Sequence, residues 1–125
     1  MSAQVRVWLG LAALSGLAAV CFGAFATHGV SDPHTRDLLH TASEYQFIHA
    51  LAVFACFSLY RAGARAAGIA AWLFLLGAVL FSGSIYGLAL APERWLGPVT
   101  PIGGLCLMAG WATLAWAGFA GTKVA

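Results

Sequence analysis

The chain has 125 residues, of which 62% are hydrophobic and only 8% are charged, whereas roughly a quarter of the residues in an ordinary soluble domain are charged. This composition places the protein in a membrane. The formal net charge of +2, without a basic patch that has interleaved aromatic residues, excludes a nucleic-acid-binding role.

Long uncharged intervals predict the helices in chain order. The first interval lies between Arg6 and Asp32, and a shorter apolar interval follows Glu44. Two further intervals flank the segment APERW, and each exceeds the roughly 20 residues that a membrane-spanning helix needs. We therefore predict a single membrane domain over residues 1–125 with spans at 6–27, 41–60, 66–90 and 98–119.

The second apolar interval is the shortest, so we expect its helix to begin near Leu38 or Thr41 and to carry Glu44 at its aqueous end. A long connection then precedes this helix, and we expect His34 and His40 to lie in that loop. The connection after the second span is short. Short connections make consecutive helices antiparallel neighbours, so the predicted fold is an all-α, up-down-up-down bundle of four transmembrane helices.

A cleaved signal peptide is a competing interpretation of the N-terminus, because Arg6 precedes the apolar run and Ala24-Phe25-Ala26 has the form of a cleavage site. The run is longer than the roughly 7–15 residues of a typical signal-peptide core, so we favour a retained first span. The lack of an Arg- and Ser-rich leader favours a bacterial inner membrane over a mitochondrial one.

The basic side chains divide unequally between the two sides of the predicted bundle. One side holds Arg6, Arg61, Arg65 and Lys123. The other side holds Arg36 and Arg94. Because Lys and Arg in short loops favour the cytoplasmic side, we expect both termini in the cytoplasm. Trp8, Tyr60 and Trp95 lie near predicted span ends, where amphipathic rings settle among the lipid headgroups.

Small residues predict where the helices approach one another, because helices in lipid associate through close packing and interhelical hydrogen bonds. The first, third and fourth spans each contain a pair of glycines suited to such contacts, and the third-span pair has GxxxG spacing. The predicted packing positions are Gly16, Gly23, Gly83, Gly87, Gly103 and Gly104. We favour packing within the bundle over a dedicated oligomer interface.

Polar side chains gather toward one end of the predicted bundle, opposite the side with more arginines. They are His28, Tyr45, Gln46, His49, Ser82, Ser84, Tyr86 and Thr100. Tyr45 and Gln46 lie four and three residues before His49, so the three share one stripe of a helix. A polar group in hydrocarbon needs a partner, so we expect these side chains inside the bundle.

Two explanations of these polar residues stay open. The first is structural, with hydrogen bonds between helices and neutral imidazoles. The second is an outward-facing pocket or a proton-responsive site around His28 and His49. The histidines match no recognised spacing of metal ligands, and Cys21, Cys56 and Cys106 are isolated in separate spans. We therefore expect neither a metal nor a cofactor.

Four stretches of the sequence, GAFATHG, YQFIHALAV, LFSGSIYGLAL and TPIGGL, resemble in the same order the signature stretches of the family catalogued as domain of unknown function 423, which includes transmembrane protein 256. The first stretch departs from the family pattern GAFGAHG, because Ala26 and Thr27 stand here. The resemblance covers nearly the whole chain. It implies an integral membrane protein of four helices without an assigned activity, and it supplies no catalytic residue.

No catalytic motif is present, so we expect that the protein is not an enzyme. The leading hypothesis is a structural, assembly or accessory partner of other membrane proteins. The alternative is a small-molecule or ion-binding carrier or channel whose outward-facing pocket surrounds His28 and His49. The expected partners are the lipid bilayer and either other membrane proteins or a second copy of the chain in a homo-oligomer, with no nucleic acid.

Overall fold

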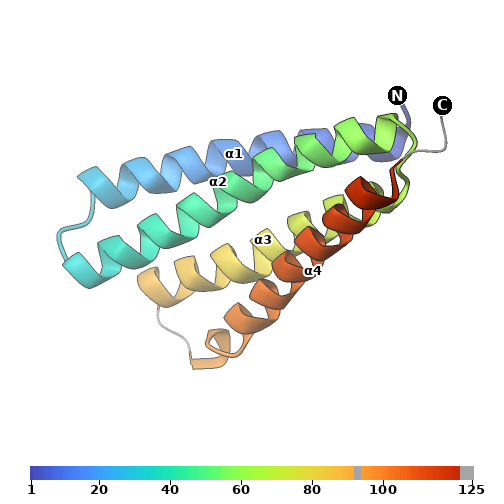
Figure 1. Cartoon of the computed structure of the whole chain (residues 1–125). Helices are drawn as coiled ribbons and strands as arrows, with labels where there is room; N and C mark the ends of the chain where they lie inside the picture. The colour runs from blue at the N-terminus through green and yellow to red at the C-terminus, as the bar shows by residue number, and fades with distance from the viewer. Residues whose placement is uncertain (92–93, 122–125) are drawn as a thin grey trace.

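The computed structural model describes residues 1–91 and 94–121. Within them the chain forms α1 (Ala3–His28), α2 (Pro33–Arg61), α3 (Ala66–Leu90) and α4 (Val99–Ala120), with a short 3-10 helix, η1 (Arg94–Leu96), before α4. Consecutive helices run antiparallel, and α1 begins at the end of the bundle where α4 finishes (Figure 1). This arrangement confirms the predicted all-α, up-down fold. Lys123, which entered the prediction of orientation, lies outside the described residues.

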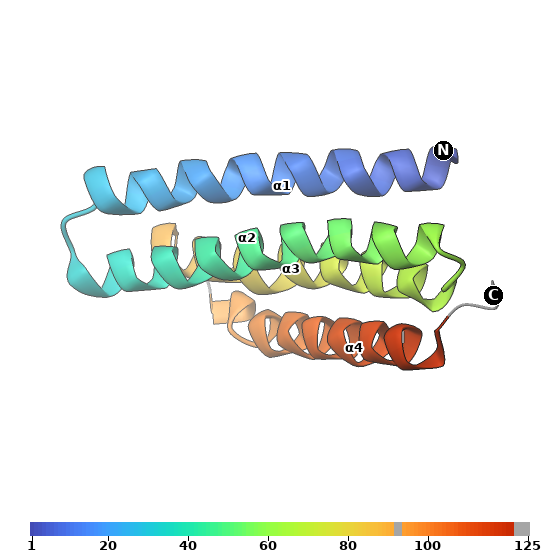
Figure 2. The same ribbon diagram turned by 45° about the horizontal axis from the view of Figure 1, so that its top comes forward.

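The four helices form an open array rather than a closed ring. α2 packs on α1 and α3, and α3 packs on α2 and α4, whereas the described residues of α1 and α4 do not contact each other. Figure 2 shows α1 and α4 on opposite sides of the α2–α3 pair. Each outer helix therefore has one main neighbour, and its remaining surface faces away from the array.

Among the described helices, α1, α3 and α4 are each long and apolar enough to cross a membrane. α2 has 29 residues, or about 43 Å of helix, but its start is polar and carries His34, Arg36 and Asp37. α2 packs along both α1 and α3, and its polar start lies at the end of the bundle where α1 finishes. The span predicted at 41–60 lies within α2.

The second helix begins earlier than predicted. Asp32 is its N-cap, with a carboxylate oxygen that accepts from the Thr35 backbone N–H at 2.9 Å, and Pro33 takes the first helical position. Both residues are helix-start signals, but a prediction based on hydropathy alone passes over them. The connection from α1 is therefore short, and His34 and His40 lie in α2 rather than in a loop.

The larger part of the core lies toward the end where α1 begins, and Trp8 is its largest side chain. Trp8 is fully buried, with its ring edge-on to Tyr60 and Trp72 at centroid distances of 5.0 and 6.3 Å. The prediction that Trp8 lies among the headgroups is therefore wrong. The ring fits inside because small residues, among them Ala67 and Gly68, surround it.

Two of the predicted packing glycines make close contacts. A Cβ at Gly103 would overlap the backbone nitrogen of Phe81 and lie 2.7 Å from the carbonyl carbon of Leu80, so α4 and α3 meet there backbone to backbone. A Cβ at Gly87 would lie 2.5 Å from the side chain of Leu96 in η1. Glycine is required at position 103, because any larger residue would push α4 and α3 apart there. At Gly87 the close atom is the end of the flexible Leu96 side chain, which can move aside.

The other predicted glycines are less constrained. A Cβ at Gly23 would touch Ser43 at 3.5 Å, and one at Gly104 would touch the ring of Phe81 at 3.7 Å, which are ordinary contact distances. A Cβ at Gly16 or Gly83 would meet nothing within 4 Å. Those two positions therefore do not pack tightly against another helix of the described chain.

Candidate functional site

Gln46 joins three helices through its side-chain amide. Its Nε2 donates to the hydroxyl of Ser15 on α1 at 3.1 Å, and its Oε1 accepts from the hydroxyl of Tyr86 on α3 at 2.5 Å. Tyr86 is 8% exposed and stacks on Phe22 of α1, with ring centroids 3.9 Å apart. We call Ser15, Gln46 and Tyr86 the amide tie, because the one amide holds α1, α2 and α3 together.

His49 joins α2 to α4. Its Nδ1 lies 2.6 Å from the carbonyl oxygen of Tyr45, and its Nε2 accepts from the indole N–H of Trp111 at 3.0 Å. A carbonyl only accepts, so Nδ1 carries the proton and the ring is neutral. The side chain is 5% exposed and packs beside Phe74. We call Tyr45, His49 and Trp111 the histidine tie.

Two serines of α3 hold its neighbours through shorter contacts. Ser82, 1% exposed, donates to the carbonyl oxygen of Ala42 on α2 at 2.7 Å. The hydroxyls of Ser84 and Thr100 lie 2.5 Å apart and join α3 to the start of α4. Lipid tails offer no hydrogen-bond partner, so each of these hydroxyls gains one from a neighbouring helix. α3 is therefore tied to the helices on both of its sides.

His28 does not join the other predicted polar residues. It is exposed in the last turn of α1, thirteen residues beyond Ser15 and so about 20 Å along the helix from the amide tie. Other groups join α1 to α2 at that end: Arg36 donates to the carbonyl oxygen of Ala26 at 3.2 Å, and the hydroxyl of Thr27 lies 3.4 Å from Nε2 of His40. The predicted cluster is thus several separate hydrogen-bonded contacts.

Prediction from sequence missed Ser15 and Trp111. Ser15 is a lone hydroxyl in a long apolar run, and Trp111 lies in the middle of α4 rather than near a headgroup boundary. A mid-span tryptophan is the signal that could have pointed to the histidine tie, because its N–H needs an acceptor in hydrocarbon. Its pairing with His49 depends on how α4 is rotated, which hydropathy does not specify.

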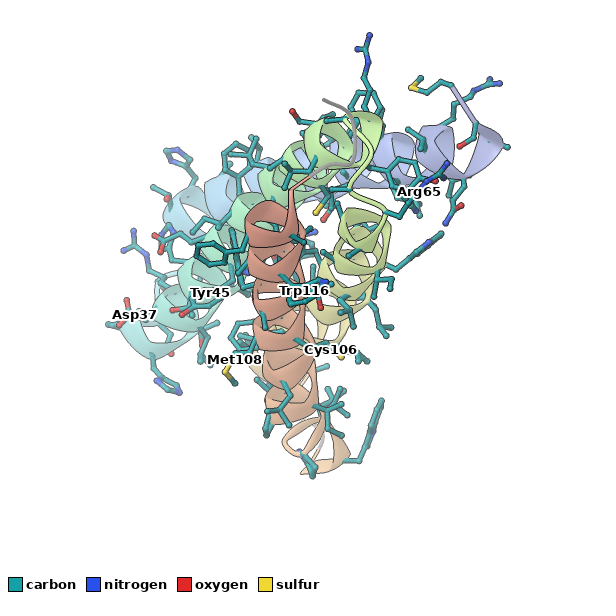
Figure 3. The ribbon with its side chains drawn as sticks, turned by 45° about the vertical axis from the view of Figure 1, so that its right-hand side comes forward. Asp37, Tyr45, Arg65, Cys106, Met108 and Trp116 are labelled. Atoms are coloured by element: carbon teal, nitrogen blue, oxygen red, sulfur yellow. The ribbon has the colours of Figure 1, made fainter. Side chains whose placement is uncertain are left out.

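A shallow groove of about 450 Å³ runs between α2 and α4 above Phe81 of α3. Tyr45 and Ile48 form one wall, and Met108 and Trp111 form the other, with His49 between them. Figure 3 shows Tyr45 and Met108 on the two helices. Its lining is mostly apolar, as expected of a surface that meets lipid or another helix. We call it the α2–α4 groove.

The described residues contain no group of three or more His, Cys, Asp or Glu side chains that could hold a metal ion. The three cysteines lie in separate helices, and Cys56 is buried in the core. The chemistry that the described polar side chains support is hydrogen bonding between helices.

Fold and polar contacts together define a helical, multi-pass membrane protein whose buried polar groups join neighbouring helices. Residues 22–104 match the family described as "Protein of unknown function (DUF423)". The chain is 43% identical over 122 residues to a UPF0382 membrane protein of Schizosaccharomyces pombe, with 88% of this chain and 98% of the relative covered. The protein belongs to this DUF423/UPF0382 family of membrane proteins.

Bacterial relatives show the same extent of similarity. The chain is 37% identical over 115 residues to a UPF0382 membrane protein of Haemophilus influenzae, covering 90% of this chain and 93% of the relative. It is 36% identical over 112 residues to the UPF0382 membrane protein YwdK of Bacillus subtilis, covering 86% and 91%. No solved structure gives a significant match. The names of these relatives describe them as membrane proteins.

Proposed function

We propose that the protein is a non-enzymatic structural, assembly or accessory partner of other membrane proteins. The observation that supports this best is that Gln46 and His49, the two most polar side chains of the predicted cluster inside α2, have partners on neighbouring helices. Gln46 bonds to α1 and α3, and His49 bonds to α4. Side chains engaged in this way fix the arrangement of the helices, and both ring nitrogens of His49 already have partners.

The open array supplies a surface for such a partner. The α2–α4 groove lies between two helices that have few contacts with each other, so a helix of another membrane protein can lie in it. Ile48 and Met108 on its two walls are 51% and 61% exposed. An apolar helix in this position would gain van der Waals contacts along both walls, which is the main source of helix association in lipid.

Site-specific photo-crosslinking in native membranes tests this proposal. A photoreactive amino acid at Ile48 or Met108 is expected to give an adduct of one defined mass with another membrane protein. The matched controls are Leu14 and Leu17 on the outer face of α1, which are similarly exposed, at 63% and 60%, and which should give only lipid adducts. If Ile48 and Met108 also yield lipid adducts alone, the proposed partner role is wrong.

The alternative, a small-molecule or ion-binding carrier or channel, has less support. It places His28 and His49 in one pocket, but His28 is exposed at the end of α1 and both ring nitrogens of His49 have partners. Nitrogen-15 NMR of labelled protein in lipid distinguishes the two functions. The partner role expects a proton on Nδ1 of His49 alone, whereas a doubly protonated ring would favour the carrier.

We further propose a bacterial inner membrane as the location, with both termini in the cytoplasm. The support is the unequal distribution of basic residues, with Arg6, Arg61 and Arg65 at the end where α1 begins and Arg36 at the other end. Labelling of single cysteines at Ser2 and at Ser31 by an impermeant reagent tests this. Labelling at Ser2 from the outside would reverse the proposed orientation.

A further inference from the structure

A hollow of about 620 Å³ opens where the first turn of α1 meets the link between α2 and α3. Arg61, Gly63 and Arg65 line it on the side of the link, and Val5, Phe57 and Tyr60 line it on the side of the helices. Arg65 is labelled in Figure 3. We call it the arginine hollow, and it differs from the α2–α4 groove because charged and apolar side chains share its lining.

Arg65 is held in a defined position within the hollow. Its Nη1 donates to the hydroxyl of Tyr60 at 2.8 Å, and its guanidinium carbon lies 5.2 Å from the centroid of the same ring. A guanidinium has several N–H donors in a rigid plane, and this bond uses one of them. The remaining donors can form the paired hydrogen bonds by which arginine recognises phosphate groups.

The described carboxylates are too far away to neutralise these arginines. Asp32 and Asp37 lie at the other end of α2, and Glu44 lies 17 residues before Arg61, which is about 25 Å along the helix. Arg61 and Arg65 are both exposed. Two cations without a nearby carboxylate favour an anion from outside the chain.

The apolar part of the lining indicates what kind of anion fits. Val5 is 3% exposed and closes the floor of the hollow, whereas Phe57 is only partly buried and lies one helical turn before Arg61, toward the middle of α2. A phosphate at the arginines would therefore have hydrocarbon contacts directly beneath it. A phospholipid has this distribution of charge and apolar surface, whereas inorganic phosphate has nothing to place against Phe57.

We propose that the arginine hollow binds the headgroup phosphate of an anionic phospholipid, with the start of an acyl chain along Phe57. Arg61 and Arg65 hold the phosphate. An anionic headgroup is preferred over a zwitterionic one, because the ammonium of phosphatidylcholine would bring a third cation close to the two arginines. Basic pockets between spanning helices are known to bind anionic headgroups in this way.

Native mass spectrometry of the purified full-length protein, with phosphatidylglycerol or phosphatidylcholine added to the detergent, tests the proposal. We expect phosphatidylglycerol to bind more tightly, and we expect Arg61→Gln together with Arg65→Gln to weaken its binding by roughly tenfold or more. The matched control is Arg6→Gln, which removes an arginine at the same end that does not line the hollow. Arg6→Gln should leave binding nearly unchanged.

Three outcomes would overturn the proposal. The first is equal binding of the two lipids, and the second is an equal loss in Arg6→Gln, which would indicate attraction to the whole basic end. The third is complete competition by inorganic phosphate at the lipid concentration, which would indicate a plain phosphate site. Arg65→Lys, which keeps the charge without the planar donors, should lose part of the binding, and circular dichroism confirms that each variant is folded.

Discussion

The α3–α4 contact and the α1–α2 contact hold helices together in different ways. α4 approaches α3 through glycine: Gly103 meets the backbone of Phe81, and a Cβ at Gly110 would lie 2.7 Å from the ring of Phe74. α1 approaches α2 through hydrogen bonds, from Gln46 to Ser15 among others. The α3–α4 contact depends mainly on glycines that let the helices approach closely, with one added hydrogen bond between Ser84 and Thr100, whereas the α1–α2 contact depends on hydrogen-bonding side chains.

This difference shows which interactions stabilise the helix array. Lipid tails are as apolar as leucine side chains, so no hydrophobic force drives helices together within the bilayer, and packing and hydrogen bonds remain. A steric contact fails as a whole when one Cβ is added, because a backbone cannot rotate away. A hydrogen-bonded contact loses one bond at a time. Four substitutions test this difference, and their expected effects decrease in order.

The largest effect is expected from Gly103→Ala. The new methyl would overlap the backbone of Phe81, so α4 must shift and the free energy of unfolding should fall by up to about 3 kcal/mol, as overpacking does elsewhere. Gly83→Ala is the control, because its Cβ would meet nothing within 4 Å and alanine is the better helix former. Unfolding by detergent titration, followed by circular dichroism, measures both. Equal stability of the two variants would contradict the steric account.

The second effect is expected from Trp111→Phe, which removes the donor to Nε2 of His49. A buried acceptor without a partner costs about 1–3 kcal/mol, so the free energy of unfolding should fall by an amount in the lower part of that range. Trp116→Phe makes the same chemical change on the same helix at a side chain that is 67% exposed. It should have little effect in the same titration, and a loss as large as that of Trp111→Phe would show that ring size alone matters.

The helices and their order could be predicted from the sequence because hydropathy over a whole span is a strong signal. The start of α2 could not be predicted from hydropathy, because Asp32 and Pro33 determine it through capping. The early start also explains why Arg36 and His40 contact the end of α1. A search for caps before every apolar run would have corrected this boundary.

The residue types of the candidate site could be predicted, but their partners could not. Polar side chains in an apolar span need hydrogen bonds, so Gln46 and His49 were identifiable. Whether Gln46 reaches Ser15 and Tyr86 depends on the rotation of three helices about their axes, and the sequence gives no register between helices. The position of His28 near a span end indicates its depth in the membrane, but it does not indicate which way the side chain faces.

A third, smaller effect is expected from Tyr86→Phe, which removes one bond of the amide tie. Hydrogen bonds between membrane helices contribute about 0.6 kcal/mol on average, so the free energy of unfolding should fall by roughly that amount. Tyr45→Phe is the control, since Tyr45 is 44% exposed. A double-mutant cycle of Tyr86→Phe with Ser15→Ala measures whether the two bonds of Gln46 reinforce each other, and a coupling of zero would show that the tie is not a unit.

The smallest effect is expected at the start of α2. The backbone N–H and then the hydroxyl of Thr35 donate to Asp32 and hold the pKa of that carboxyl below its ordinary value of 3.8. A lowered pKa means that the folded state favours the charged carboxylate, so its contribution is present above pH 3.8 and is lost as the pH falls through the lowered pKa. Asp32→Ala should therefore lower the melting temperature slightly at neutral pH, and the difference from the native chain should shrink in acid. Asp32→Asn, which keeps a capping oxygen without a charge, should lie between the alanine variant and the native chain at neutral pH and should lack this pH dependence. A deficit of Asp32→Ala that persists unchanged in acid would show that the N-cap charge does not contribute.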